Sequence, residues 1–405
     1  MYAQDRRLQN IFVAFSAQLK RQKHPLKDIK AIEAISRCRT EALGTAYYSC
    51  ENQHGTVTQH HSCRHRSCFL CASKSRLQWI ESQRSKLFNT PHFHVVFTLP
   101  HEYLSLWRYN RALFTRIIFK ASKETLLSLM ADPRHQGVTP GILMALHTWG
   151  RQLSLHPHTH CLVTAGGLTT SGEWQESGEY LLPIHVLKKL YRGKTQALIQ
   201  EAFESQALVL PPDITPRQFD ALHKATYRKT WSARIEERYD HGKGVMLYLA
   251  CYLKGGPFNP TQLGHCDAST ISFRYLDHRA KRYRDLSLPP LTFLKRLLDH
   301  VPEGGVHTIR YYGLYASSNK TRRETCKRQL GDLQEEPCNT GTQETVMSGS
   351  CRQRGEPLRH RYSIWRRFRK GNSYKGSGAS DLVQQDNEAE FISAPGQRDY
   401  CQLQV

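Results

Sequence analysis

The stretch Leu155-His156-Pro157-His158-Thr159-His160-Cys161-Leu162-Val163-Thr164 decides the fold that we expect for this chain. Strand side chains repeat with period two, so a strand here would point His158 and His160 to one face, about 6–7 Å apart. Two imidazoles at that spacing can hold one divalent cation. The apolar end of the stretch and the following Gly166-Gly167 are typical of a strand and its turn. By itself, the pattern leaves open metal ligation and a chance cluster of surface histidines.

Apolar runs on either side predict neighbouring strands. Residues 92–99 favour a buried strand, and residues 142–149 lead through a polar break into the histidine stretch, as in a hairpin. His94 lies on one of these strands and could also approach a metal. Further strands or a short helix are expected at 270–279 and 306–314. Apolar residues at helical spacing predict helices over 1–37, from Glu102 to about Met130, within 171–205, and over 212–240 with a basic face.

A cysteine-rich segment at residues 38–71 holds five of the twelve cysteines. Cys68 and Cys71 are spaced so that two thiolates can clamp one zinc ion. In a reducing compartment, metal binding explains such a segment better than disulfides do, although a redox-active or incidental cysteine pair is the alternative. The zinc site that we predict uses Cys50, His54, Cys68 and Cys71, with Cys63 as the main substitute.

Charge indicates a polyanionic partner. The 405 residues include 57 Lys and Arg against 35 Asp and Glu, a net charge of +22, which most often means nucleic acid. A membrane surface would also attract this charge, but no apolar run approaches 18 residues and the first residues lack a signal-peptide pattern. We therefore expect a soluble, cytoplasmic protein without membrane partners. Basic side chains near the cysteines would contact DNA phosphates: Arg64, Arg66, Lys74 and Arg76.

A tyrosine segment follows further along the chain. Tyr248 and Tyr252 are four residues apart, which on a helix puts both phenols on one face. Gly255-Gly256-Pro257 would end that helix, and Lys254 just before it could contact phosphate. Core packing is the ordinary explanation of two such tyrosines. From about residue 317 the chain becomes polar and basic, with interleaved aromatic residues that could stack on single strands or belong to a disordered tail, which we favour.

These motifs, in this order, resemble the rolling-circle transposases of bacterial insertion sequences, which are two-tyrosine members of the HUH endonuclease superfamily. The resemblance runs from about Cys38 to Tyr315. It rests on the segments 62–71, 92–101, 146–163, 248–257 and 310–314. Three departures stand out. Thr159 replaces the apolar residue between the two histidines, and Gln53 or His54 occupies the place of a second cysteine. An expected distal cysteine pair is scattered over Cys326, Cys338 and Cys351.

The resemblance implies an α+β fold, with an HUH-type antiparallel sheet and flanking helices preceded by a small zinc module. The implied domains are 1–90 for the N-terminal helix and zinc-binding, DNA-binding module, 91–316 for the catalytic domain, and 317–405 for a basic tail. The implied location is the bacterial cytoplasm, in association with the nucleoid.

The implied activity is nicking and rejoining of single-stranded DNA at the element's ends and at its target, through a 5′-phosphotyrosine. Tyr252 and Tyr248 would be the nucleophiles. His158 and His160 would hold Mg²⁺ or Mn²⁺, with His156 or His94 as a third ligand, and Zn²⁺ would be structural. No nucleotide cofactor is needed, because the covalent link stores the bond energy.

Two other functions remain open from the sequence. One is a rolling-circle replication initiator or relaxase, which would share the histidine and tyrosine chemistry. The other is a zinc-dependent DNA-binding protein without catalysis, such as a decayed copy of an element, in which the tyrosines are core residues. Covalent protein–DNA adducts would separate catalysis from binding alone.

Overall fold

The computed structural model describes residues 5–49, 56–240, 245, 256–277 and 280–331. Its centre is an antiparallel sheet of five strands in the order β12-β4-β5-β3-β8. The predicted hairpin forms β4 and β5, and the apolar run at 92–99 forms β3 beside it. The strand bounds are β3 His92–Thr98, β4 Gly141–Trp149, β5 Leu155–Thr164, β8 Ala233–Tyr239 and β12 Ile309–Gly313.

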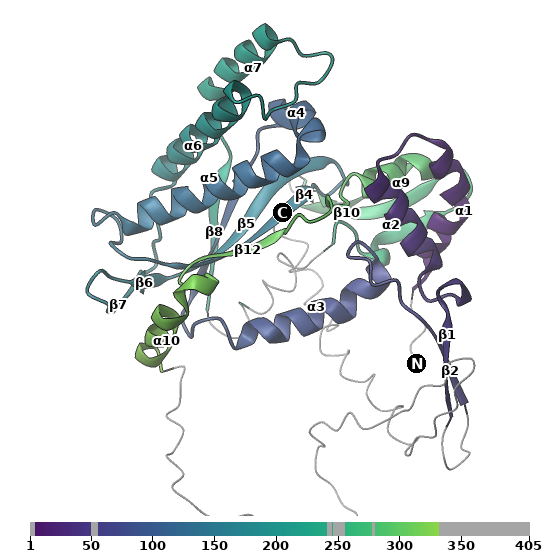
Figure 1. The fold of residues 1–405 in the computed structure, drawn as a ribbon, viewed down its shortest axis with the longest axis horizontal. Coiled ribbons are helices and arrows are strands. Elements are labelled where there is room, and N and C mark those ends of the chain that lie inside the picture. Colours follow the sequence, from purple (N-terminus) through teal and green to yellow (C-terminus); the bar gives the residue numbers. More distant parts are fainter. Residues whose placement is uncertain (1–4, 50–55, 241–244, 246–255, 278–279, 332–405) are drawn as a thin grey trace, which may run out of the picture.

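Helices cover one face of this sheet (Figure 1). They are α4 Leu104–Tyr109, α5 Arg111–Ala131, α6 Ile184–Glu204 and α7 Pro216–Arg228. The main hydrophobic core lies between these helices and the strand residues Phe93, Val95, Phe97, Met144 and Val163. Alternation along the strands therefore sends these apolar residues to the helical face and the histidines to the other face.

The opposite face of the sheet carries the histidines and packs against α3, which spans Phe69–Arg84 (Figure 1). A smaller apolar cluster joins Ile80 of α3 to Leu143 and Leu162 of the sheet. At the end of α3, the hydroxyl of Tyr311 donates a hydrogen bond of 2.7 Å to Oε1 of Gln83. Helix α3, which belongs to the predicted zinc module, thus packs directly on the face of the sheet that carries the histidines, called the histidine face below.

A second core joins the two ends of the described chain. It packs α1 (Arg7–Arg21) and α2 (Leu26–Arg37) against α9 (Pro290–Leu298) and a three-stranded sheet in the order β11-β10-β9. Those strands are β9 Leu263–Cys266, β10 Ile271–Asp277 and β11 Arg282–Leu288. This core therefore takes residues from both sides of the domain boundary expected near residue 90.

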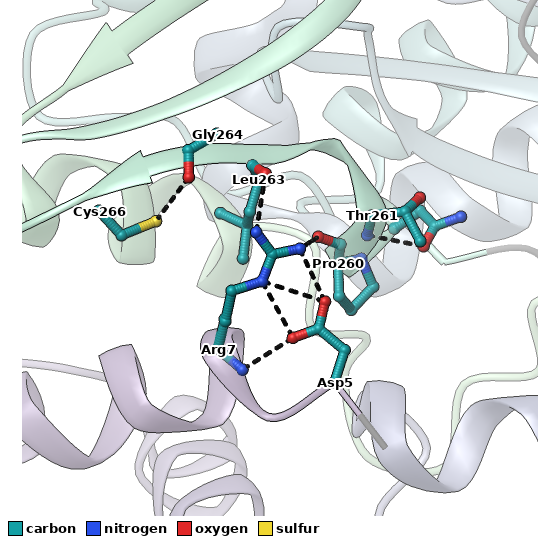
Figure 2. Close-up of polar contacts among 8 residues, drawn as sticks. Asp5, Arg7, Pro260, Thr261, Leu263, Gly264 and Cys266 are labelled. Carbon is teal, nitrogen blue, oxygen red and sulfur yellow. Dashed lines mark hydrogen bonds and ion pairs between the residues drawn. The ribbon is translucent and has the colours of Figure 1, made fainter. Parts of the chain in front are cut away.

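Arg7 strengthens this junction (Figure 2). Its guanidinium donates hydrogen bonds to the carbonyl oxygens of Leu263 at 3.0 Å and Pro260 at 3.3 Å. The carboxylate of Asp5 accepts from the same guanidinium and from the Arg7 backbone N–H. The start of α1 is thus tied to the chain that follows the tyrosine segment.

Smaller elements complete the described structure. Two hairpins are formed by β1 Thr45–Ser49 with β2 Thr56–His60, and by β6 Gly166–Leu168 with β7 Trp174–Glu176. Short 3-10 turns are η1 Glu41–Leu43, η2 His101–Tyr103, η4 Pro260–Gln262 and η5 Ser317–Asn319. The last helix, α10, spans Lys320–Gln329 and buries Cys326, so regular structure continues past residue 316, where we had expected the tail to begin.

The α+β expectation is confirmed, but one predicted helix is wrong in part. Residues 212–240 do not form a single helix, because α7 ends at Arg228 and β8 begins at Ala233. Trp231 between them is 2% exposed and donates its indole N–H to the carbonyl oxygen of Thr226 at 3.0 Å. This packing turns the chain, and pairing with β3 then satisfies the backbone of β8. None of the described helices is long and apolar enough to cross a membrane.

Candidate metal centres

Three histidines meet on the α3-covered face of the sheet. His147 of β4 is the direct partner of His158 on β5, and His160 follows two residues later on the same face. All three side chains are buried, at most 4% exposed, and one nitrogen from each lies within 4.8 Å of the others. Strand pairing alone therefore builds this histidine cluster.

The hydrogen bonds of His158 define which of its nitrogens faces the cluster. Its Nδ1 lies 2.6 Å from the carbonyl oxygen of His156, which can only accept, so Nδ1 carries the proton. The lone pair is then on Nε2, 3.0 Å from Nε2 of His160. Two nitrogens about 2.1 Å from one metal ion and at right angles to each other would be about 3.0 Å apart. This spacing fits a shared divalent cation.

Burial keeps these imidazoles uncharged. It lowers the pKa of His158 and of His160 well below the usual range, and neighbouring histidines add to the effect. Burial likewise lowers the pKa of His94 to about 3. Neutral imidazole is the form that binds a metal, so the cluster is ready for ligation at neutral pH.

The third member of the cluster is His147. The two candidates for a third ligand from the sequence lie beside it: the ring of His156 is 5.1 Å from that of His158, and His94 contacts His160. The ring of His147 lies 4.5 Å from that of His160 and stacks at 4.2 Å on Trp149. His156 has an exposed side chain and contributes its backbone carbonyl to His158. His94 bonds to Nδ1 of His160, on the far side of that ring from the cluster. His147 joins the cluster because the register of β4 and β5 pairs it with His158, and the sequence pattern does not reveal that register.

Four cysteines form the second cluster, and each sulfur lies within 4.8 Å of the others. Cys38 follows α2, Cys63 follows β2, Cys68 caps the start of α3, and Cys71 lies in its first turn. The Sγ of Cys71 is 3.6 Å from that of Cys38 and 3.8 Å from that of Cys63. Sulfurs bound to one tetrahedral zinc at about 2.3 Å are about 3.8 Å apart, so the donor set fits zinc.

The surroundings of the sulfurs also suit metal-bound thiolates. Backbone N–H groups of Cys63 and His65 point at the sulfurs of Cys38 and Cys63, at 3.5 and 3.4 Å. A hydrogen bond with Cys68 lowers the pKa of Cys63 to about 5, and burial raises the pKa of Cys38 to about 11. A cation is therefore what would let all four become thiolates together.

This cysteine cluster contains three of the predicted zinc residues, Cys63, Cys68 and Cys71. Its fourth member, Cys38, was missed, because it precedes Cys63 by 25 residues and no ligand spacing marks it. Cys50 and His54 lie outside the described residues.

The predicted nucleophiles Tyr248 and Tyr252, with Lys254, also lie outside the described residues. Val245, which precedes Tyr248 by three positions, is described. It is 1% exposed and belongs to the apolar cluster that includes Leu143 and Leu162 on the histidine face.

Of the basic residues predicted to contact DNA, Arg64 and Arg66 are exposed. The guanidinium of Arg66 donates to the carbonyl oxygen of Val306 at 2.9 Å and to Oγ1 of Thr308 at 3.1 Å, so it also ties the cysteine loop to the chain before β12. Arg76 is half-buried, and this burial lowers its pKa. The side chain of Lys74 is outside the described set.

Two known protein families match this chain, and each match covers one of the two clusters. A family described as "Transposase zinc-binding domain" matches residues 8–99, which contain the cysteine cluster. A second family, described as "Putative transposase", matches residues 141–323, which contain the histidine cluster and the tyrosine segment.

Two relatives extend this similarity over most of the chain. "Putative transposase y4qJ" of Sinorhizobium fredii is 33% identical over 310 residues, covering 75% of this chain and 78% of the relative. "Transposase for insertion sequence element IS801" of Pseudomonas savastanoi pv. phaseolicola is 32% identical over 305 residues, covering 72% of each chain. No solved structure matches this chain. Identity at this level over three quarters of the chain, together with both family matches, shows that the protein belongs to the insertion-sequence transposases of the IS91 and IS801 type.

Proposed function

We propose that this transposase nicks and rejoins single-stranded DNA at the ends of its insertion sequence through a 5′-phosphotyrosine intermediate. The observation that carries the proposal is the histidine cluster, His147, His158 and His160, buried and preorganised on the central strands. Val245 supports it, because it is buried on the same face of the sheet only three residues before Tyr248.

The chemistry assigns the bond exchange to the tyrosines. The phenolic oxygen of Tyr252 or Tyr248 would attack the scissile phosphorus, forming a P–O bond to tyrosine while the bond to the 3′ oxygen breaks. The leaving strand takes a proton and ends in a 3′-OH. Attack by a 3′-OH on the phosphotyrosine reverses the exchange and rejoins DNA, so no nucleotide cofactor is consumed.

Tyrosine has a reference pKa near 10, so the phosphate must be made more reactive at neutral pH. A divalent cation at the histidine cluster would supply this by polarising the non-bridging oxygens and orienting the phosphate for in-line attack. We propose His147, His158 and His160 as its ligands. Imidazole nitrogen suits Mn²⁺ better than Mg²⁺, which prefers oxygen, and both remain candidates.

Arg234 is a candidate phosphate contact beside this cluster. On β8 it lies opposite Val96, whose other partner on β5 is His160, so all three share one row of the sheet. Its side chain is 58% exposed and pairs with Glu236 at 3.0 Å. The positive charge of Arg234 contributes to the lowered pKa of His160. An incoming phosphate would therefore meet a cation two strands away from His160, with β3 between them.

We further propose that Cys38, Cys63, Cys68 and Cys71 hold the structural zinc ion. Four thiolates fill a tetrahedral zinc and leave no open position for chemistry. The ion would hold the start of α3, which begins beside Cys68 and packs on the histidine face. The zinc site would therefore stabilise both the N-terminal module and the helix α3 that covers the histidine cluster.

The decisive experiment uses single-stranded oligonucleotides that cover the element's own ends, with Mn²⁺ or Mg²⁺ and a denaturing gel. An oligonucleotide labelled at its 3′ end keeps the label in a 5′-phosphotyrosine adduct. Wild type should form this adduct, and EDTA or the double variant Tyr248→Phe, Tyr252→Phe should abolish it. Tyr180→Phe, at a tyrosine that is 61% exposed and outside both clusters, is the matched control and should keep it.

The alternatives make different predictions in the same assay. A protein that only binds DNA would shift the oligonucleotide on a native gel and give no adduct under any condition. A replication initiator or relaxase would give the adduct but would prefer an origin over the element's ends, and membership in a transposase family favours the ends. We propose that the reaction takes place in the bacterial cytoplasm, on nucleoid DNA.

A further inference from the structure

We propose that His94 positions His160 for metal binding and is not itself a metal ligand. The inference rests on the proposed function of the histidine cluster. It assigns a role to a buried histidine that neither the cluster nor the tyrosine chemistry uses.

The contact between His94 and His160 is direct. Nε2 of His94 lies 2.9 Å from Nδ1 of His160, and the two rings stack with centroids 5.1 Å apart and planes inclined by 27°. His94 is fully buried on β3, a strand paired on both sides by β5 and β8. The register partner of His94 on β5 is Leu162, whereas the pairing with β8 shifts register at this residue, so pairing with β5 fixes its backbone.

The imidazole tautomer explains why this contact matters. A neutral histidine that binds metal through Nε2 carries its proton on Nδ1, and that N–H needs an acceptor when it is buried. For His158 the acceptor is the backbone carbonyl of His156, at 2.6 Å. For His160, Nε2 of His94 lies at hydrogen-bond distance from Nδ1, at 2.9 Å. The Nδ1–H of each proposed ligand therefore has an acceptor: a backbone carbonyl oxygen for His158 and a side-chain nitrogen for His160.

The same geometry argues against His94 as a ligand. Nε2 of His160 faces Nε2 of His158 at 3.0 Å, whereas His94 meets the opposite ring nitrogen. Nε2 of His94 therefore cannot contact both Nδ1 of His160 and a cation held at the Nε2 side. As an acceptor, His94 would orient the ring and raise the basicity of its ligating nitrogen.

His92 provides a matched control on the same strand. It lies two residues before His94, points to the same face, and is equally buried. Its Nε2 contacts the hydroxyl of Tyr315 at 2.7 Å, and it is not one of the three histidines that form the cluster. A substitution there tests the cost of losing a buried histidine from β3 without touching the proposed metal site.

The experiment measures Mn²⁺ affinity by the electron paramagnetic resonance signal of free Mn²⁺, using the full chain with its zinc bound. His94→Phe keeps a ring but removes the acceptor, and we expect it to weaken Mn²⁺ binding by about 10- to 100-fold, the usual effect of losing such a partner. His94→Gln offers an amide oxygen and should recover most of the affinity. His92→Phe should bind Mn²⁺ like wild type, and saturating Mn²⁺ should restore cleavage to His94→Phe.

The outcomes separate this inference from the proposed function. If wild type binds Mn²⁺ and His158→Ala does not, the metal site stands, and unchanged affinity in His94→Phe would overturn the positioning role alone. Equal weakening in His94→Phe and His92→Phe would also overturn it, because the effect would then be structural. If wild type shows no Mn²⁺ site that His158→Ala removes, the proposed function fails together with the inference.

Discussion

The cysteine cluster and the histidine cluster both bring potential metal-binding side chains together, but different parts of the fold hold those side chains in place. The four cysteines come from the end of α2, a loop after β2 and the start of α3, so they do not share one sheet. The three histidines come from two paired strands near the middle of a five-stranded sheet. Around a zinc ion the four cysteines would leave no open position, whereas a cation on the three histidines would keep positions open for a substrate.

This difference teaches which cluster depends on its metal. Thiols gathered from loops and helix ends are held by less regular structure than strand residues, so a bound zinc ion would contribute to folding. The histidines are held by the sheet whether or not a cation is present. Removing zinc should therefore change the structure. Removing the cation proposed at the histidine cluster should change only DNA cleavage.

The largest effect is expected from Cys68→Ser. Loss of one thiolate should release the zinc and unfold the start of α3, because structural zinc in small modules contributes on the order of 10 kcal/mol. Calorimetry should show a melting temperature lower by more than about 5 °C, with zinc lost by elemental analysis. Cys266→Ser, at an exposed cysteine outside the cluster, is the control and should change neither. Zinc kept by Cys38→Ser but lost by Cys50→Ser would show that the ligand set is wrong.

The next largest effect is expected from His160→Ala. Cleavage of the oligonucleotide should fall by at least about 100-fold, comparable to the loss of one strong electrostatic contact to a reacting centre. Zinc content should stay at the wild-type level, because the cysteine cluster does not involve β5. Normal adduct formation by this variant in single-turnover kinetics would contradict a catalytic role for the cluster.

A smaller and more discriminating effect concerns the third ligand. His147→Asn should weaken Mn²⁺ binding by about tenfold or more, since a coordinating nitrogen is lost. His156→Asn keeps the backbone carbonyl that His158 uses and should leave Mn²⁺ binding near wild type. The reverse ranking in a titration of the two variants would restore His156 as the ligand.

The smallest effect is expected at Arg7, which ties the second core together. Arg7→Gln removes the hydrogen bonds to the carbonyls of Leu263 and Pro260 and should lower the free energy of unfolding by about 1 kcal/mol. Urea denaturation would measure it, with Arg134→Gln as control, because Arg134 is exposed and pairs only with the nearby Asp132 in the described contacts. Equal shifts for both variants would mean that the junction adds no stability.

Much of the histidine face could be read from the sequence, because its signals are local. Period-two alternation gave the common face of His158 and His160, and the apolar runs gave β3, β4 and β5. His147 could not be found this way, because its position opposite His158 depends on a pairing register with an irregularity between His147 and Trp149. Cys38 was missed for a related reason, since folding and not spacing brings it to Cys71.

The partial failure at residues 212–240 has a physical cause as well. Basic residues at helical spacing run past Arg228 into Arg234, so periodicity favoured one long helix. The helix instead ends before Trp231, whose indole packs into the core, and the following residues pair with the edge of β3. Such tertiary contacts override a weak helical pattern. That override puts Arg234 on the sheet beside the histidines.

The second core also has a consequence for how the chain is made. The apolar faces of α1 and α2 find their partners in β9, β10 and α9, and the contact between Arg7 and Leu263 spans 256 residues of sequence. At a synthesis rate of about 5–20 residues per second, roughly 13–50 s separate the emergence of these two residues from the ribosome. During that interval α1 and α2 can pack on each other, but the side chains that face β9, β10 and α9 lack these partners. The second core can therefore be completed only after the chain has been translated through α9.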